Sequence, residues 1–224
     1  MNVYFNYCLP GFSNCYILGS DGGDADREAG SVPEAGAAPA EPPDALIVDP
    51  GAMNENIVDI VERQGYRIRG VLLTHDHWNH CRGLRTLKRI YETDIYAVNQ
   101  QVRDFTTVMV KNGDSLNLGR FQVGVIGIPG HSTDSVVYRI GNLLFTGDTL
   151  SAGLLGTTVS TYGERVQIAT LQSRLFSLTG DFVVLPGHGP PSSLEAERRF
   201  NAGFQEFEEH KIRRPQFNLD LLDD

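Results

Sequence analysis

The chain has 224 residues, of which 41% are hydrophobic, and its formal net charge is -9 at pH 7. This negative charge argues against nucleic acid and against an anionic membrane surface as binding partners. No run approaches the roughly 20 apolar residues that a membrane-spanning helix needs, and the first residues lack the basic segment of a secretory signal. We therefore expect a cytoplasmic protein that forms a single domain over residues 1–224, and its oligomeric state stays open.

The first predicted elements are strands interrupted by an acidic stretch. Met1–Asn6 is predicted to be a strand, and Asn14–Leu18 and Ala45–Asp49 are predicted to form a hairpin. Residues 21–44 include seven acidic residues, one basic residue and no aromatic residue. Such a stretch buries too little apolar surface to offset the entropy lost on ordering. We interpret residues 20–44 as a flexible insertion, with a binding segment for a basic partner as the alternative.

Helical and strand-like patterns alternate over the rest of the chain. In order, they are a helix over 54–63, a strand over 67–73, a helix over 84–91, a strand over 94–98, a hairpin of strands 108–110 and 116–118 around the turn 111–114, strands over 121–128, 135–140 and 143–145, a helix over 166–178, a strand over 182–185 and a helix over 193–211. Gly65 is a typical C-terminal cap of the first helix, and Ser193 is a typical N-terminal cap of the last. This order predicts an α/β fold of mixed sheets covered by helices.

A histidine-rich turn follows the strand predicted over 67–73. Side chains alternate in an extended segment, so His75, His77 and Asn79 point to one side. His80 turns toward the same place where the chain enters the next helix. Three imidazoles within six residues, next to the end of a buried strand, predict a metal site.

Three further polar side chains occupy equivalent places in the chain. His131 and His188 lie in Pro-Gly-His turns, and Asp148 lies in the turn Thr-Gly-Asp-Thr. Each turn comes directly after an apolar, strand-like run. We therefore expect all of these residues to meet the first histidines at one edge of the sheets.

Other polar and aromatic residues near these motifs carry weaker predictions. The three cysteines have no CxxC spacing, so we expect no disulfide framework. Cys81 adjoins His80, but adjacent helical residues point about 100° apart, which favours a buried thiol over a metal ligand. Trp78 is predicted to be a packing or pocket-wall residue. The side chains predicted to orient the histidines from behind are Thr74, Asp49 and Asp76, with a turn-forming role before Pro50 as an equal alternative for Asp49, and those predicted to line a substrate entrance are Tyr162 and Arg165.

The motifs His-x-His-x-Asn-His, Pro-Gly-His-Ser, Thr-Gly-Asp-Thr and Pro-Gly-His-Gly-Pro, in this order, resemble the metallo-β-lactamase-fold hydrolases. The pattern is most similar to the small glyoxalase II-like (hydroxyacylglutathione hydrolase-like) group, from about Asn14 to about Phe204. The resemblance implies an αββα sandwich, in which two mixed β-sheets are flanked by helices and the metal site lies at one edge. It also implies that the separate C-terminal substrate domain of larger members is absent. The chain departs from the family motif at Asn79, where the family has aspartate.

The resemblance further implies two metal ions bridged by Asp148. The first ion would be bound by three imidazoles: His75, His77 and His131. The second would be bound by the remaining two, with the amide beside them: His80, His188 and Asn79. We take Asp148 and Asn79 as the catalytic positions. Because an amide is a poorer metal ligand than a carboxylate, we expect one Zn²⁺ bound firmly and a second bound weakly, with Fe or Mn as alternatives.

The predicted function is metal-dependent hydrolysis of a small-molecule thioester or ester. A bound divalent ion lowers the pKa of its water to about 7, which supplies a nucleophile at neutral pH. Two alternatives stay open because of Asn79. The first is a mononuclear-iron enzyme similar to persulfide dioxygenases, and the second is a metal-binding protein with little catalysis.

Overall fold

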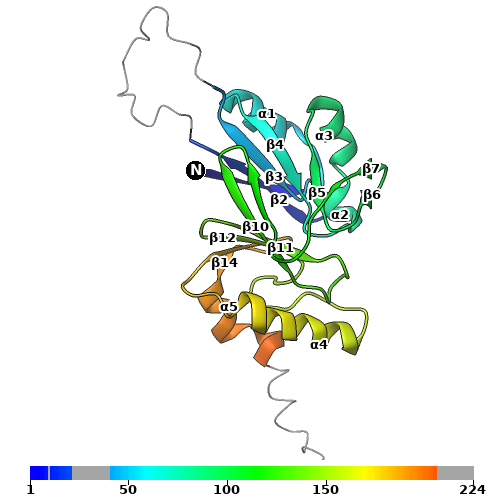
Figure 1. Cartoon of the computed structure of the whole chain (residues 1–224), viewed down its shortest axis with the longest axis vertical. Helices are drawn as coiled ribbons and strands as arrows, with labels where there is room; N and C mark the ends of the chain where they lie inside the picture. The colour runs from blue at the N-terminus through cyan, green and yellow to red at the C-terminus, as the bar shows by residue number, and fades with distance from the viewer. Residues whose placement is uncertain (10, 22–40, 206–224) are drawn as a thin grey trace, which may run out of the picture.

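The computed structural model describes residues 1–9, 11–21 and 41–205 (Figure 1). Most of the predicted acidic insertion, and the predicted last helix beyond residue 205, lie outside these residues. Within them, two six-stranded sheets are stacked between two groups of helices. The predicted αββα sandwich of mixed sheets is therefore confirmed. None of the described helices is long and apolar enough to cross a membrane.

The first sheet combines an antiparallel and a parallel half. Its strands, in spatial order, are β1 (Asn2–Cys8), β2 (Ser13–Gly19), β3 (Asp44–Val48), β4 (Arg67–Leu72), β5 (Ile95–Ala97) and β8 (Val108–Met109). The first three strands pair antiparallel, and β3, β4, β5 and β8 run parallel. The predicted hairpin on either side of the acidic stretch is thus the β2–β3 pair, in which Tyr16 lies opposite Val48.

The second sheet is antiparallel except for one pair. Its strands, in spatial order, are β14 (Ser192–Ser193), β13 (Val183–Pro186), β12 (Leu143–Gly147), β11 (Val136–Ile140), β10 (Phe121–Gly127) and β9 (Ser115–Leu118). Strands β12 and β13 run parallel, so both end at the same edge of the sheet. A separate two-stranded sheet consists of β6 (Gln101–Val102) and β7 (Phe105–Thr106).

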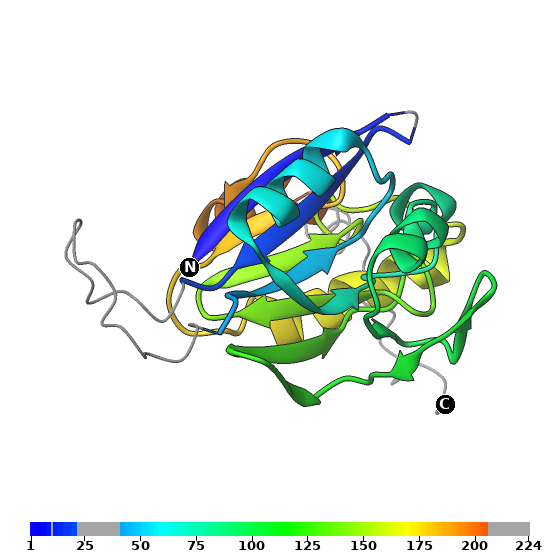
Figure 2. The same ribbon diagram turned by 90° about the horizontal axis from the view of Figure 1, so that it is seen from above.

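The helices cover the two outer faces of the stacked sheets. Figure 1 shows α1 (Glu55–Gln64), α2 (Trp78–Cys81) and α3 (Leu84–Ile90) at one end, and α4 (Thr161–Thr170) and α5 (Leu194–Phe200) at the other. In the view turned by 90°, α1 and the strands of the first sheet lie nearest the viewer (Figure 2). The predicted caps are present: Gly65 has a left-handed backbone with φ 64°, and the Ser193 hydroxyl accepts a hydrogen bond from Ala196 N.

Alternation of side chains along the strands divides the core into three layers. Ile17 and Ile47 face α1 and α3, whereas their neighbours Leu18 and Leu46 face the second sheet. On the other side of the second sheet, alternate residues of β11, β12 and β13 pack against the helices: Val137, Leu144 and Val184. Burying both faces of each sheet explains the nearly continuous apolar runs of its central strands.

Three predicted elements differ from the structure. The hairpin predicted around 111–114 is wrong, because β8 pairs with β5 in the first sheet and β9 pairs with β10 in the second. The turn at 111–114 therefore connects the two sheets. The helix predicted over 166–178 begins earlier, at Thr161, because the Ser160 hydroxyl caps it, and it ends in a π-helical turn over Leu171–Leu175. The last helix is interrupted at Asn201, where the backbone becomes extended.

Candidate metal centre

The residues predicted to bind metal all follow the carboxyl ends of strands or the turn into a helix. His75 and His77 come after β4, and His80 lies within α2, for which His77 is the residue before the first turn. The other side chains follow β10, β12 and β13: His131, Asp148 and His188. The parallel ends of β12 and β13 are held together by a hydrogen bond of 2.8 Å from Gly187 N to Gly147 O. The two sheets thus deliver all of these side chains to one edge.

Four of these residues form a first cluster, in which the ligand atoms lie within 4.8 Å of one another: His75, His77, His131 and Asp148. The Nδ1 atom of His77 is 3.0 Å from Nε2 of His75 and 3.0 Å from Nε2 of His131. The Oδ2 atom of Asp148 is 3.5 Å from Nε2 of His131 and 3.8 Å from Nε2 of His75. Three imidazole nitrogens and one carboxylate oxygen therefore converge on one point.

Asp148 also belongs to a second cluster, with His80 and His188. Its Oδ1 atom is 3.2 Å from Nε2 of His80, and its Oδ2 atom is 3.6 Å from Nε2 of His188. Asn79 lies beside this cluster, because its Nδ2 atom is 2.8 Å from Nε2 of His188. A rotation of the amide by 180° would present its acceptor oxygen at the same place. One carboxylate is thus shared by both clusters, and the amide adjoins the second.

Hydrogen bonds behind the rings decide which nitrogen of each histidine carries the proton. The Nδ1 atoms of His131 and His188 are each 2.7 Å from a backbone carbonyl, of Thr157 and Phe12 respectively. A carbonyl oxygen only accepts, so both Nδ1 atoms are donors. In a neutral imidazole, the lone pair then lies on Nε2, which points into the cluster. This arrangement orients histidines as metal ligands.

Asp49 fixes the proton on Nδ1 of two further histidines, His80 directly and His75 through Thr74. Its Oδ2 atom accepts from Nδ1 of His80 at 3.1 Å and from Oγ1 of Thr74 at 2.6 Å. Because the Thr74 hydroxyl donates its hydrogen to Asp49, it must accept from Nδ1 of His75, which is 3.1 Å away. Thr74 N donates to the other oxygen of Asp49. The structure therefore places Asp49 and Thr74 where the sequence predicts them, whereas Asp76 accepts a hydrogen bond from Asn99 instead.

The surroundings shift the pKa values of His75, His77 and Asp148 toward metal-binding forms, but shift that of His80 the other way. Burial and the neighbouring charge of His80 lower the pKa of His75 to about 2, and burial also lowers the pKa of His77. Burial would raise the pKa of Asp148, but hydrogen bonding to His80 and the other imidazoles outweigh it and lower that pKa. Burial disfavours a charged His80, yet Asp49 and Asp148 raise its pKa to about 10. Metal binding must therefore displace a proton from His80.

Two buried atoms at the centre fit a bound cation. Among the described residues, His80 Nε2 and Asp148 Oδ1 are both buried and face each other at 3.2 Å, and neither has any other partner. In the first cluster, Nδ1 of His77 lies 3.0 Å from Nε2 of both His75 and His131, so three ring nitrogens converge where a cation could take all three lone pairs if His77 is protonated on Nε2. Gly187 keeps the space open, because a Cβ there would be 2.5 Å from Asp148 Oδ1. Nitrogen ligands with one carboxylate suit Zn²⁺, and also Fe or Mn.

Comparison with known families agrees with this geometry. Residues 43–191 match the profile of the Metallo-beta-lactamase superfamily. The chain belongs to this superfamily.

Among its relatives, the chain is similar to the uncharacterized protein Rv2581c of Mycobacterium tuberculosis, with 31% identity over 70% of this chain and 86% of the relative. It is also similar to hydroxyacylglutathione hydrolase GloC of Haemophilus influenzae, with 25% identity over 70% of this chain and 85% of that protein. The structure of ETHE1 from Myxococcus xanthus superposes with a TM-score of 0.71, at 21% identity, over 96% of this chain and 93% of the other. At that identity, the superposition shows a shared fold.

Three other residues with sequence-based predictions, Cys81, Trp78 and Tyr162, are not in either cluster of candidate metal ligands. Cys81 is buried and belongs to neither cluster of candidate ligands. Its Sγ atom instead accepts a hydrogen bond from Nε of Arg103 at 3.2 Å. Trp78 is half exposed at a pocket, and Tyr162 is 76% exposed on α4. Sequence reasoning did not identify the carbonyls that orient His131 and His188, because any residue carries a backbone carbonyl.

Proposed function

We propose that this protein is a metal-dependent hydrolase that cleaves a thioester or small ester in a small-molecule substrate. The observation that carries the proposal is that Asp148 belongs to both clusters: its Oδ2 atom faces imidazole nitrogens of the first cluster and of His188, and its Oδ1 atom faces His80. A hydrolase needs this arrangement if it is to hold two divalent ions with one carboxylate between them. The similarity to GloC supports a thioester as the substrate class.

The ligand residues divide between a stronger and a weaker site. The first Zn²⁺ would be held by His75, His77, His131 and Asp148, and Fe or Mn are alternatives. The second would be held by the other two imidazoles and the same carboxylate, with an amide beside them: His80, His188, Asp148 and Asn79. When bound, such ions lower the pKa of a water to about 7 and polarise a carbonyl oxygen.

The chain itself contributes orientation and charge. The carbonyls behind His131 and His188, and the carboxylate of Asp49, keep the protons on the outer nitrogens. Asp148 stays ionised and is the only carboxylate in either cluster of described residues. Asn79 can donate or accept a hydrogen bond but cannot take up a proton, so it orients groups and does not act as a base. The three free cysteines suit a reducing, cytoplasmic compartment.

The test compares two variants, Asp148→Ala and His188→Ala, by metal content and by turnover of a thioester panel. We expect the first variant to lose both metals and all activity, because it removes the shared ligand. The second should lose mainly one equivalent of metal. Retention of both metals by Asp148→Ala would refute the bridging role of Asp148.

A single-metal enzyme is the second candidate, and the amide of Asn79 at the second cluster favours it. In this case the protein would hold one iron and oxidise a persulfide, as the resemblance to persulfide dioxygenases implies. Oxygen consumption with a persulfide, without hydrolysis of any ester or thioester, would support this candidate over the first.

A further inference from the structure

Helix α2 contributes to a second feature besides the metal centre. Asn79 and His80 belong to the centre, whereas Trp78 and Cys81 line a separate pocket with a volume of about 300 Å³. The pocket is open to solvent, and its other lining residues come from the end of α2, from α3, from the turn between β6 and β7, and from β7. This volume is at the lower end of the range for small-molecule sites.

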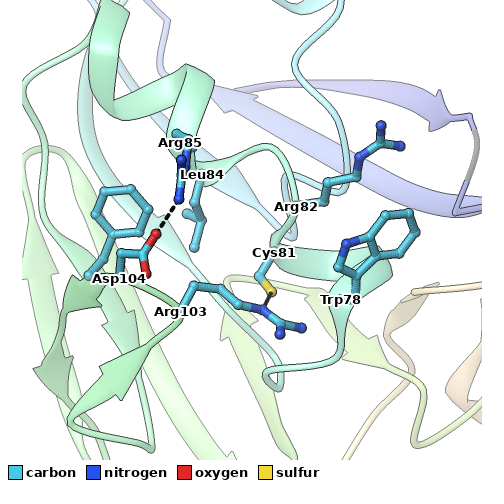
Figure 3. Close-up of a pocket in the computed structure, with 8 residues that line it drawn as sticks. Trp78, Cys81, Arg82, Leu84, Arg85, Arg103 and Asp104 are labelled. Atoms are coloured by element: carbon cyan, nitrogen blue, oxygen red, sulfur yellow. Dashed lines mark hydrogen bonds and ion pairs between the residues drawn. The ribbon is translucent and has the colours of Figure 1, made fainter.

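The pocket is positively charged although the chain as a whole is acidic. Three guanidinium groups line it, from Arg82, Arg85 and Arg103, against the single carboxylate of Asp104. Figure 3 shows Trp78 and Arg82 on one side, Arg85 and Asp104 on the other, and Arg103 between them. A local excess of positive charge in a protein with a net charge of -9 attracts anions selectively to this place.

Two of the three guanidinium groups have capacity for a ligand. Arg85 forms an ion pair with Asp104. Within the described part of the chain, no carboxylate lies within ion-pair distance of Arg82 or Arg103. The Arg82 guanidinium lies 4.8 Å from the centre of the Trp78 ring, which holds it over the indole. Arg103 uses Nε to donate to Cys81 Sγ and Nη2 to donate to the Asp76 carbonyl, which leaves its remaining N–H groups for an anion.

The β6–β7 hairpin turn and two hydrogen bonds position the Arg103 side chain. Its φ of 54° is in the left-handed region, which a residue with a long side chain rarely adopts. Arg103 is the first residue of the two-residue loop of the β6–β7 hairpin, where a positive φ is the usual conformation, so the turn accounts for it. Here the contacts with Cys81 and Asp76 direct the guanidinium into the pocket.

We propose that this pocket binds an organic oxyanion, a carboxylate or a phosphate attached to a flat apolar group. The planar forks of Arg82 and Arg103 match the paired oxygens of such anions. The Trp78 indole and the Phe105 ring provide apolar surface for the attached group. The site does not depend on the proposed hydrolase activity.

The fluorescence of Trp78 tests this proposal, because it is the only tryptophan in the chain. The metal-loaded protein is titrated with phenyl phosphate, benzoate and the neutral benzyl alcohol, and calorimetry repeats each titration. At least one anion should bind saturably, and the comparison of the two anions identifies the preferred oxyanion. Equal binding of benzyl alcohol, or no binding of either anion, would overturn the proposal.

Four variants locate the bound anion. Arg82→Gln should weaken binding about tenfold or more, since it removes a charge-assisted contact at an exposed position. Asp104→Asn should tighten binding about two- to fivefold, because it frees Arg85 from its exposed ion pair. Arg63→Gln, at an exposed ion pair on α1, is the matched control and should change nothing. If His188→Ala abolishes binding while Arg82→Gln does not, the anion binds at the metal centre and the proposal is wrong.

Discussion

Replacement of Asp49 by asparagine should damage the metal centre without removing any metal ligand. Asp49 is 1% exposed, and its Oδ2 atom accepts from both Thr74 Oγ1 and His80 Nδ1. An amide NH₂ in this place donates and cannot accept. A neutral His80 must then carry its proton on Nε2, the atom that faces Asp148, and the Thr74 hydroxyl loses the acceptor that fixes its orientation toward His75. If the amide turns the other way, its NH₂ faces the donor Thr74 N instead.

The expected loss follows from these contacts. Loss of a partner behind a ligating histidine typically weakens metal binding about 10–100-fold. This corresponds to about 1.4–2.8 kcal/mol at about 1.4 kcal/mol per factor of ten. The second site should lose more than the first, because His80 contacts Asp49 directly whereas His75 contacts it through Thr74. The stabilisation that saturating zinc gives against thermal unfolding should fall by a similar free energy.

The assay is a zinc titration against a competing chelator of known affinity, with thermal unfolding measured with and without zinc. Asp44→Asn is a matched control, because Asp44 is also a buried aspartate and begins β3, the strand that Asp49 follows. Asp44 is bound by Arg67 and Arg69, away from the metal ligands. The control should reduce stability but leave zinc affinity unchanged. Wild-type zinc affinity in Asp49→Asn, or equal weakening in the control, would refute the reasoning.

Three further results are expected. Asn79→Asp should strengthen binding of the second metal by about 1–2 kcal/mol, measured by the same titration, because it adds an anionic oxygen next to His188; unchanged affinity would show that the position is not a ligand. Gly187→Ala should reduce metal content, because its Cβ would lie 2.5 Å from a carboxylate oxygen, whereas Gly124→Ala, where the nearest atom is 3.7 Å away, should not. Burial raises the pKa of Asp44, but the two guanidinium groups outweigh this and lower it. Its contribution to stability should therefore be fully present above about pH 4 and be lost progressively as the pH falls from there through the lowered pKa of the folded state, so the difference in urea unfolding between wild type and Asp44→Asn should be smaller at acidic pH than at pH 7; an equal difference at both pH values would contradict this.

The sequence alone predicts the elements whose signals are local. Gly65 marks the end of α1, because a left-handed glycine acts within one helical turn, whereas Asn54, predicted as the first helical residue, is the cap before it. The spacing of His75, His77 and His80 after an apolar strand likewise predicts that their rings converge, because strand alternation and the following turn are short-range geometry. The order of motifs predicts the αββα sandwich through the resemblance to a known family. The acidic insertion at 20–44, the single domain and the ligand roles remain predictions.

Only the tertiary structure decided which distant groups complete the site and the sheets. Strands β8 and β9 flank a turn typical of a hairpin, yet they belong to different sheets. Each of these short strands forms the edge of its own sheet and pairs with β5 or β10, because the strand preference of a short segment depends on its tertiary context. The carbonyls of Phe12 and Thr157 orient two histidines but have no sequence signature, because every residue carries the same carbonyl. Asp49 and His80 are 31 positions apart, and their contact exists only because parallel strands β3 and β4 end side by side. Local chemistry along the chain therefore predicts the candidate ligands, whereas packing of the two sheets supplies the groups that fix the proton on four of the histidines: His75, His80, His131 and His188.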